Sequence, residues 1–373
     1  IPKFNLQNIC CHAAIKNLST ALDEDLMKTQ FGFRKARSTS TPLACIRRFL
    51  ERAEASVDPI CLVFLDWEKA FDRVKQDKLM EALERMGLPS KFVEAIKSLY
   101  KNPQFCVRVG DFQSSWRAQK CGIRQGCPLS PYLFIIMMTV LFRDVYDEVD
   151  LSRGRLDGLD FSDLLYADDS ALFTNNVHAM NRLLLKIEEH ASYYGLAFNK
   201  TKCVSLNFHL ARKPVFADGS QVPETEETVY LGGLISKNHD HRQEVTRRIS
   251  ACFGTFRKLD VFWKRSNCPK KFKIQVYDAV VRSKLLYGLE SVYLTTQVKN
   301  KLDVFQLKGL RKILGMQTTF MDRSNTNARV FQKATEAINT SSEHNRQVKP
   351  FSTYLQQKQQ SLLKHTLRAT DDD

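Results

Sequence analysis

Three aspartates in this sequence occupy positions where carboxylates are costly unless something neutralises them. Asp66 ends the apolar run PICLVFLD at 59–66, and Asp168 and Asp169 stand side by side within LLYADDSALF at 164–173. Clustered carboxylates repel one another and resist desolvation unless a cation lies between them. Mg²⁺ prefers oxygen ligands, and two such ions about 3.5–4 Å apart support phosphoryl transfer. Taken alone, the pattern favours a plain surface hairpin turn, and a metal site at the turn is the alternative that other segments of the chain must support.

The elements around these aspartates predict an α+β fold. The run at 59–66 has the length and composition of a buried strand, and 164–173 is typical of a hairpin. A strand, then helices, then a hairpin favours an antiparallel sheet with helices on one face over a doubly wound fold. Further elements are predicted as helices at about 77–86, 90–100 and 176–194, a long apolar helix from Ser130, a hairpin at 104–119, strands at about 203–208 and 228–235, and helices between about 239 and 316.

The composition favours a polyanionic partner and no membrane span. Lys and Arg exceed Asp and Glu by 56 to 41, which gives a net charge of +15. The longest apolar run, 132–142, is shorter than the roughly 18–20 residues that cross a bilayer. The ten cysteines lack zinc-ligand spacing and are interpreted as reduced thiols of an intracellular protein, nuclear or cytoplasmic.

Several further segments have local interpretations as turns, helix ends or hairpins, but their order along the chain is informative. They are QFGFRKARST at 30–39, DWEKAFDRV at 66–74, GIRQGCPLSP at 122–131, YADD at 166–169, GLAFNKTK at 195–202 and VYLGGLIS at 229–236. Within 66–74, Asp72 is interpreted as a turn or cap residue. In this order the segments resemble the reverse transcriptase family of non-LTR retrotransposons and, more distantly, of group II introns. The resemblance covers roughly 28–316, including RRIS, LLYGLE and LRKILG near its end.

The resemblance implies a right-hand polymerase fold with fingers, palm and thumb. The expected segments are fingers at 1–58, palm at 59–235, a fingers insertion at about 75–120, a primer-grip hairpin at about 228–235 and a helical thumb at 236–317. The polar remainder, 318–373, is expected to be disordered or loosely helical. The fingers segment ahead of Gln30 is short, and no endonuclease domain or CCHC knuckle is recognised.

The resemblance also assigns the chemistry to particular residues. Asp66 and Asp168 would hold both metal ions, Asp169 would be a weaker ligand, and the backbone carbonyl of Trp67 would be a further one. Lys202 matches a lysine that would protonate the leaving pyrophosphate, with an exposed strand lysine as the alternative.

Further residues would bind the nucleotide and the primer. Phe71 matches a steric gate against the ribose 2′-hydroxyl, a role compatible with a core aromatic. Gln125 and Gly126 would line the nucleotide and template pocket. Arg34, the preferred residue, and Arg37 could clamp a triphosphate, or could be solvated loop charges. The primer grip would comprise Tyr230, Leu231, Gly232 and Gly233.

The function implied is RNA-directed DNA polymerase activity with two Mg²⁺ ions, or Mn²⁺ in their place. The partners would be an RNA template, a DNA primer or RNA–DNA hybrid, and dNTPs; no oligomeric state is indicated. An RNA-dependent RNA polymerase is one alternative, against which YADD and Phe71 argue. A non-catalytic or degenerate RNA-binding protein with the polymerase fold is the other, against which the three retained aspartates argue.

Overall fold

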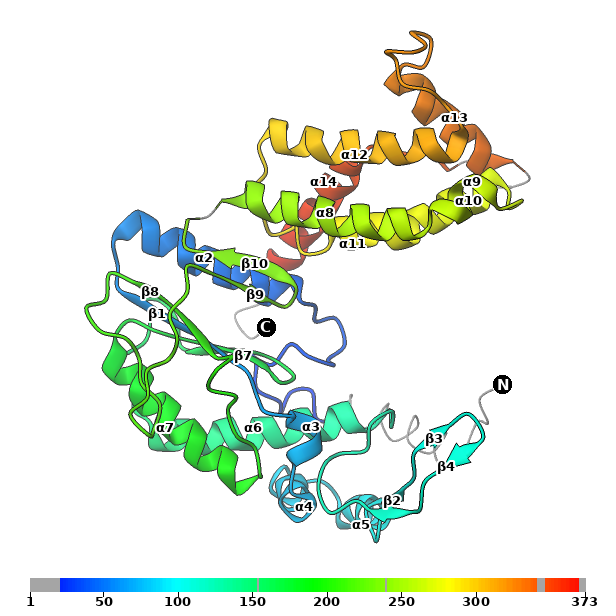
Figure 1. The fold of residues 1–373 in the computed structure, drawn as a ribbon. Helices are drawn as coiled ribbons and strands as arrows, with labels where there is room; N and C mark the ends of the chain where they lie inside the picture. Colours follow the sequence, from blue (N-terminus) through cyan, green and yellow to red (C-terminus); the bar gives the residue numbers. More distant parts are fainter. Residues whose placement is uncertain (1–20, 153, 239, 341–345, 369–373) are drawn as a thin grey trace. The chain divides into compact units, whose positions relative to one another are not determined.

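The chain is described by a computed structural model that covers residues 21–152, 154–238, 240–340 and 346–368 (Figure 1). The first part of the fingers segment predicted at 1–58, residues 1–20, therefore lies outside the described residues. The chain divides into two compact units. The first comprises Ile1–Pro42 and Arg48–Leu231, and the second comprises Leu43–Arg47 and Gly232–Asp373.

The first unit is built on an antiparallel sheet with the strand order β6–β7–β1–β8. Its strands are β1 (Ile60–Leu65), β6 (Asp163–Tyr166), β7 (Asp169–Thr174) and β8 (Val204–Phe208). The central strand β1 pairs with β7 on one side and β8 on the other, so segments about 100 and 140 residues later in the chain flank it. The predicted α+β class is confirmed by this sheet and the helices around it.

Both faces of the sheet are covered, so the expectation of helices on one face only is wrong. Every residue of β1 is buried. Cys61, Val63 and Leu65 belong to the large core that also contains α6 and α7. On the opposite face, Phe173, which pairs with Leu62, contacts Phe49 of α2 at 4.5 Å between ring centroids. A continuous apolar strand is the expected pattern when neither face meets water.

The helices of this unit supply most of its core. They are α2 (Ser40–Ser56, of which residues 43–47 belong to the second unit), α3 (Ala70–Arg73), α4 (Gln76–Arg85), α5 (Ser90–Leu99), α6 (Ser130–Glu148) and α7 (Val177–Tyr193). The apolar run at 132–142 lies in α6, which is buried nearly all round and lies with α7 along the sheet (Figure 1). Within the four described ranges, no helix combines the length and the apolar character that a membrane span requires.

A paired-strand arm follows α5. Its strands are β2 (Gln104–Phe105), β3 (Arg108–Val109), β4 (Phe112–Gln113) and β5 (Arg117–Ala118). β2 pairs with β5 and β3 with β4, as the predicted hairpin at 104–119 requires. All four strands are exposed, so the arm contributes little to the core.

The first unit buries one carboxylate that has no part in the proposed chemistry. Asp163, fully buried in β6, accepts hydrogen bonds from the hydroxyls of Tyr146 and Thr29. Burial raises the pKa of Asp163 to about 6 although both hydrogen bonds lower it. Burial, and then the charge and hydrogen bond of Asp163, raise the pKa of Tyr146, whereas the charge of Arg155 lowers it.

This burial makes stability depend on pH in a definite direction. The pKa of Asp163 is higher in the folded protein than in the unfolded chain. The contribution of protonated Asp163 to the free energy of unfolding is therefore complete below about pH 4 and is lost as pH rises through about 6. We expect Asp163→Asn to abolish this loss, which amounts to roughly 3 kcal/mol at most. Urea unfolding of both proteins between pH 4.5 and 6.5 measures it, because other titrating groups cancel in the difference. Parallel stability curves would contradict the prediction.

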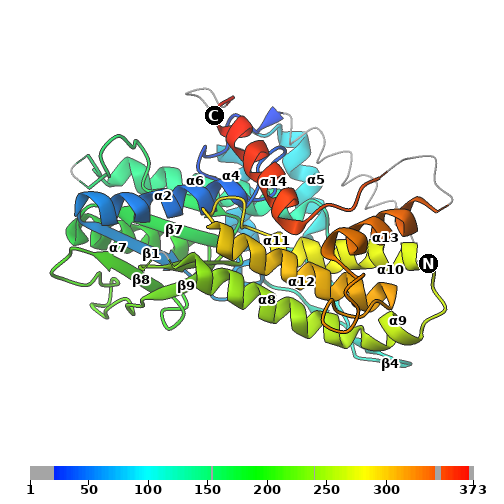
Figure 2. The same cartoon turned by 90° about the horizontal axis from the view of Figure 1, so that it is seen from above.

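The second unit is helical apart from the strand β10 (Gly233–Ser236). Its helices are α8 (His241–Lys258), α9 (Asp260–Arg265), α10 (Lys270–Tyr277), the π-helix η1 (Asp278–Arg282), α11 (Ser283–Leu286), α12 (Thr296–Leu314), α13 (Asn327–Asn339) and α14 (Phe351–Thr366). Figure 2 shows α8 and α12 running alongside each other. Trp263 and Tyr277 are among the largest buried side chains of its core.

The polar segment after 318 is more ordered than predicted. α13 and α14 both pack against α12, and Val330, Ala334, Phe351 and Leu355 are fully buried. The side chain of Gln306 holds the start of α14 by donating to the carbonyl of Lys349 and accepting from the amide of Phe351. The expectation of disorder or loose helix is therefore wrong for these helices, because a few apolar residues at helical spacing are enough to dock them.

Candidate active site

The paired aspartates lie in a tight hairpin at the end of the central strand. β6 and β7 are joined through Ala167 and Asp168, and Tyr166 pairs with Asp169. Leu65, the last residue of β1, pairs with Ser170, so the next residue, Asp66, comes beside Asp169. The sheet register thus brings the three predicted aspartates to one edge, as the sequence indicated.

The hairpin holds a strained backbone conformation. Ala167 has φ of 58°, in the left-handed region that residues with a Cβ rarely adopt. Such strain persists only where surrounding contacts impose it, and it is common at functional sites. Ser170 donates to the carbonyl of Asp168 and accepts from the indole nitrogen of Trp67 at 3.2 Å. Trp67 is buried against Phe198, so the hairpin is connected to the core.

The three carboxylates repel one another. Burial and then the charges of Asp168 and Asp66 raise the pKa of Asp169 to about 6. Burial, together with Asp66, also raises the pKa of Asp168. No basic side chain of the described residues contributes to either shift, and none forms an ion pair with the three aspartates. The site therefore has an excess of negative charge.

A divalent cation suits this set of donors. Among the described residues, no group of three or more Asp, Glu, His or Cys side chains is arranged to hold a metal ion in this conformation. The strand register nevertheless brings the three aspartates to one edge of the sheet without a basic partner. Oxygen donors with uncompensated charge are what Mg²⁺ prefers. Asp66, Asp168 and Asp169 are thus the residues that fit such an ion.

The segment after Asp66 is held by the GLAFNKTK segment. The carbonyl of Asp66 accepts from the amide of Asn199 at 2.8 Å, and its amide donates to the thiol of Cys203. One step further, the amide of Glu68 donates to the carbonyl of Ala197. These contacts fix the backbone at Asp66 and Trp67; the carbonyl of Trp67 is the one predicted to be a further metal ligand.

On its other side the same segment is held by GIRQGCPLSP. The carbonyl of Phe71 accepts from the amide of Ile123 at 2.7 Å, and Gln125 donates to the carboxylate of Asp72 at 2.8 Å. Asp72 therefore positions Gln125 rather than acting only as a turn residue. Gly126 has φ of 79°, and a Cβ there would meet open space, so its surroundings are accessible. The ring of Phe71 stacks on Phe134 at 4.4 Å and is half-buried.

Three consecutive residues to which no role was assigned from the sequence, Gln30, Phe31 and Gly32, contact the aspartate hairpin. The side-chain carbonyl of Gln30, fully buried, accepts from the amides of Gly32 and Ala167 at 2.8 and 2.9 Å. Gly32 lies so close that a Cβ there would be 2.4 Å from the nitrogen of Ala167. The amide of Phe31 donates to the carbonyl of Leu165 at 2.7 Å. The signal in the sequence was the Gln-Phe-Gly triplet, whose glycine admits this close approach.

Arg34, the preferred triphosphate ligand, is placed differently from the expectation. Its side chain is 3% exposed and pairs with Asp23 through two nitrogens at 2.8 and 3.0 Å. It also donates to the carbonyls of Asp23, Met27 and Gln30. Such an arginine stabilises the loop around it and is not available to a nucleotide. Arg37 is partly exposed, donates to the carbonyl of Lys28 and lies over the ring of Phe31.

The two lysines of the GLAFNKTK segment differ in their surroundings. Lys200 pairs with Glu188 at 2.7 Å and with Asp218 at 2.9 Å. Lys202 is exposed, and its backbone amide donates to the carbonyl of Asn199. Lys202 is therefore the accessible one of the pair, as its predicted role requires.

The predicted primer-grip segment forms a hairpin from β9 (Glu227–Tyr230) and β10 (Gly233–Ser236), and the boundary between the units falls in its turn. Leu231 and Gly232 both have positive φ, as in the two-residue turns favoured by β-hairpins. In the first unit, buried Tyr230 donates to the carbonyl of Leu164 and lies against Phe64. In the second, Gly232 accepts from Arg248, which also pairs with buried Glu244.

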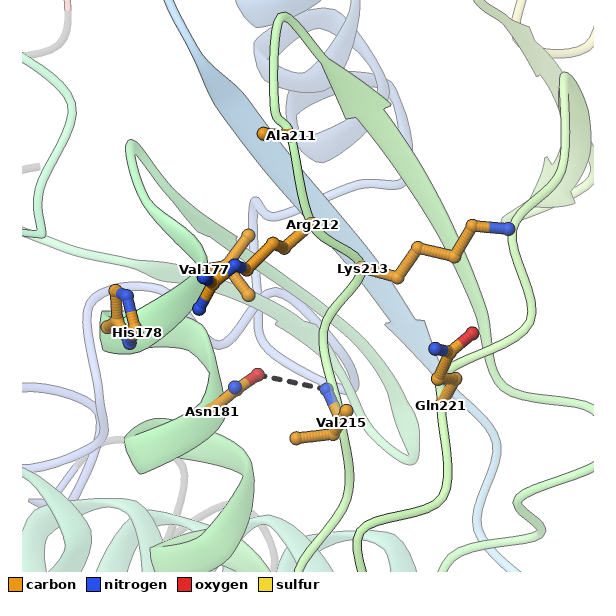
Figure 3. A pocket seen from close by; sticks show the side chains of 8 residues that line it. All are labelled: Val177, His178, Asn181, Ala211, Arg212, Lys213, Val215 and Gln221. Carbon is orange, nitrogen blue, oxygen red and sulfur yellow. Dashed lines mark hydrogen bonds between the residues drawn. The ribbon is translucent and has the colours of Figure 1, made fainter.

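One cavity of about 480 Å³ is lined by none of the site residues predicted from the sequence. It is lined by the start of α7 and by the loop around Arg212 and Lys213 (Figure 3). Asn181 accepts from the amide of Val215 at 2.9 Å across it. Lys213 pairs with Glu224. Its lining includes no carboxylate, so it does not provide a metal site.

The chain belongs to the reverse transcriptase (RNA-dependent DNA polymerase) family, whose match covers residues 6–235. It is 26% identical over 302 residues to the RNA-directed DNA polymerase from mobile element jockey of Drosophila funebris, covering 77% of this chain and 32% of that protein. It is 28% identical over 177 residues to the Pol polyprotein from retrotransposable element R2 of Nasonia vitripennis, covering 48% and 17% respectively. The predicted family is confirmed, and the chain spans about a third of the jockey protein.

Among solved structures, a telomerase from Candida albicans in complex with a fragment of telomeric RNA aligns with a TM-score of 0.49 and 12% identity. The alignment covers 86% of this chain and 56% of that one.

Proposed function

We propose that this chain is an RNA-directed DNA polymerase that extends a primer on an RNA template by adding dNTPs. The observation that carries the proposal is the register that places Asp66 beside Asp168 and Asp169 with no counter-charge. Family membership supports the same activity. In this proposal the first unit provides palm and fingers, and α8–α12 of the second provide the thumb.

Each residue then has a physical role. Asp66, Asp168 and Asp169 would hold Mg²⁺ or Mn²⁺, and two such ions supply an activated primer hydroxyl and a stabilised leaving oxygen. The amide of Asn199, which donates to the carbonyl of Asp66, and the side-chain carbonyl of Gln30, which accepts from the amide of Ala167, would keep the carboxylates in place. Lys202 would give a proton to the departing pyrophosphate. Arg37 replaces Arg34 as the proposed triphosphate contact, since Arg34 is committed to Asp23.

The proposal is tested by primer extension. A DNA primer annealed to an RNA template is incubated with the protein, each of the dNTP or NTP sets, and Mg²⁺. Extension with dNTPs that stops on addition of a chelator supports the proposal. Preferential use of NTPs would favour an RNA-dependent RNA polymerase, and no extension above that of an active-site variant would favour a non-catalytic RNA-binding protein.

Phe71 provides a prediction about substrate choice. Its half-buried ring stacks on Phe134, so one face is packed against the core while part of the ring stays exposed. We expect Phe71→Val to raise the use of NTPs relative to dNTPs by about ten- to a hundredfold, the range that one pocket contact supplies. Competing dNTP and NTP incorporation by both proteins measures this ratio.

Phe92→Val is the matched control, because Phe92 is also a half-buried ring packed against the same core. It should lower stability without changing the NTP to dNTP ratio. An unchanged ratio in Phe71→Val would show that this ring is a core residue and no gate.

A further inference from the structure

The paired-strand arm at 101–120 exposes apolar side chains that a monomeric surface rarely presents together. Phe112 is 85% exposed and Trp116 is 62% exposed. The other exposed large apolar residues of the arm are Phe105, Val107 and Val109. Val109 lies opposite Phe112 in the strand pairing, and exposed large apolar side chains gathered in one short segment favour an interaction site. The arm extends away from the four-stranded sheet in both views (Figure 1 and Figure 2).

The charges of the arm identify the class of partner. Four basic side chains, Lys101, Arg108, Arg117 and Lys120, are exposed, and Asp111 is the one acidic residue. None of the four pairs with a carboxylate of the described residues. Arg117 lies directly opposite Phe105 in the strand pairing, so a cation and an aromatic ring alternate across the arm. Aromatic rings that stack bases, among cations that contact phosphates, are the features of single-strand nucleic-acid binding.

The arm's own structure fits a binding platform. The backbone pairs at Gln104–Ala118 and at Val109–Phe112 keep both ends of the arm paired. Between them, Ser114 is bonded to Val107 through its amide and its hydroxyl. The aromatic side chains are thus carried on a paired backbone although they are not needed for the core. Rigid rings lose little conformational freedom when a base stacks on them.

The arm leads directly into the candidate active site. Its last strand ends at Ala118, and Gln125, the proposed template contact, follows within the next segment. The amide of Gly122 donates to the carbonyl of Val74, which anchors the base of the arm to the segment carrying Phe71. The base of the arm and Gln125 are therefore both held to the segment 71–74, since Gln125 donates to Asp72.

We propose that this arm binds the single-stranded RNA template next to the polymerase site, by stacking bases on Phe112 and Trp116 and contacting phosphates through Arg108 and Arg117. The proposal rests on the proposed function for the choice of RNA template. It assigns template contact to residues that lie outside every motif used to recognise the family.

Tryptophan fluorescence tests the stacking directly. The chain has three tryptophans, and Trp67 and Trp263 are 6% and 2% exposed, so Trp116 provides the accessible signal. Titration of the full chain with a 16-nucleotide single-stranded RNA should quench its emission, and Trp116→Phe should remove most of that quenching. Emission that does not respond to RNA would overturn the proposal.

Affinity measurements separate stacking from charge. Phe112→Ala with Trp116→Ala should weaken binding of a labelled RNA by tenfold or more. Arg108→Gln with Arg117→Gln should reduce the slope of log affinity against log salt by about 1.4, or 0.7 for each phosphate contact. Phe320→Ala is the control, because Phe320 is 93% exposed but lies outside the arm, and it should bind as the wild type does.

The outcomes also distinguish this proposal from the proposed function. RNA binding that depends on the arm, without primer extension, would support the arm and reject the polymerase activity. Primer extension by the wild type, together with arm variants that bind RNA as tightly as the wild type does, would support the polymerase activity and reject the arm as a template contact. If the wild type instead self-associates in sedimentation and the arm variants do not, the arm is a protein contact and the proposal is overturned.

Discussion

Asp168→Asn should abolish primer extension, with a loss on the order of a thousandfold or more, equal to about 4 kcal/mol of activation free energy. Asn has nearly the same shape, but it cannot supply the negative charge that the proposed metal ions require. The measurement is the initial rate of extension on an RNA template at saturating dNTP. Asp169→Asn should leave more residual activity, because Asp169 is expected to be the weaker ligand.

The Asp168→Asn variant should keep or raise the free energy of unfolding. Burial and the charge of Asp66 disfavour the Asp168 carboxylate, so a neutral side chain relieves repulsion. Asp157→Asn removes an exposed charge of the first unit and serves as the control, with wild-type activity. A stable Asp168→Asn protein that extends primers at the wild-type rate would remove this aspartate from the chemistry.

Gly32→Ala is expected to have the second largest effect, although Gly32 would contact neither nucleotide nor metal. Its new Cβ would be 2.4 Å from the nitrogen of Ala167 and 3.0 Å from the carbonyl carbon of Tyr166. Both are backbone atoms of the aspartate hairpin, so the hairpin or the Gln30 segment must move. A misplacement of about 1 Å costs on the order of a hundredfold in rate, and we expect a loss of that size.

Two measurements check this effect. The rate of primer extension should fall, and the free energy of unfolding should fall by about 1–3 kcal/mol. Gly254→Ala is the matched control, since Gly254 lies in α8 with nothing near its Cβ position, and alanine there should be neutral or stabilising. A Gly32→Ala protein with the wild-type rate would show that this contact does not position the aspartates.

The convergence of the aspartates could be predicted because it follows from local patterns. An apolar run that ends on Asp66 and a hairpin around Asp168 have clear periodicities, and pairing them requires only one sheet. The covering of both faces was also accessible in principle, since β1 has no polar residue. The prediction of one covered face was based on the order of the strands and helices along the chain and did not use the continuous apolar character of β1.

The burial of Arg34 and the contact between Gln30 and Ala167 depend on residues elsewhere in the sequence, which no local pattern shows. Arg34 and Arg37 stand in the same loop three residues apart, and only the position of Asp23 makes one a buried structural residue. Gln30 reaches Ala167 across 137 positions of sequence. The helices α13 and α14 are the exception, because they do have a local pattern: Val330 with Ala334 and Phe351 with Leu355 are each four residues apart, within a composition that is otherwise polar.

The clamp on Asp66 has a consequence for how the protein is made. The amide of Asn199 and the thiol of Cys203 hold Asp66 from more than 130 residues later in the chain. A nascent chain that has emerged from the ribosome only through the paired aspartates has all three carboxylates but not this clamp. Contacts at such separation form late and slowly. In a growing chain, these contacts can therefore hold the backbone at Asp66 only after residues 199–203 have been synthesised.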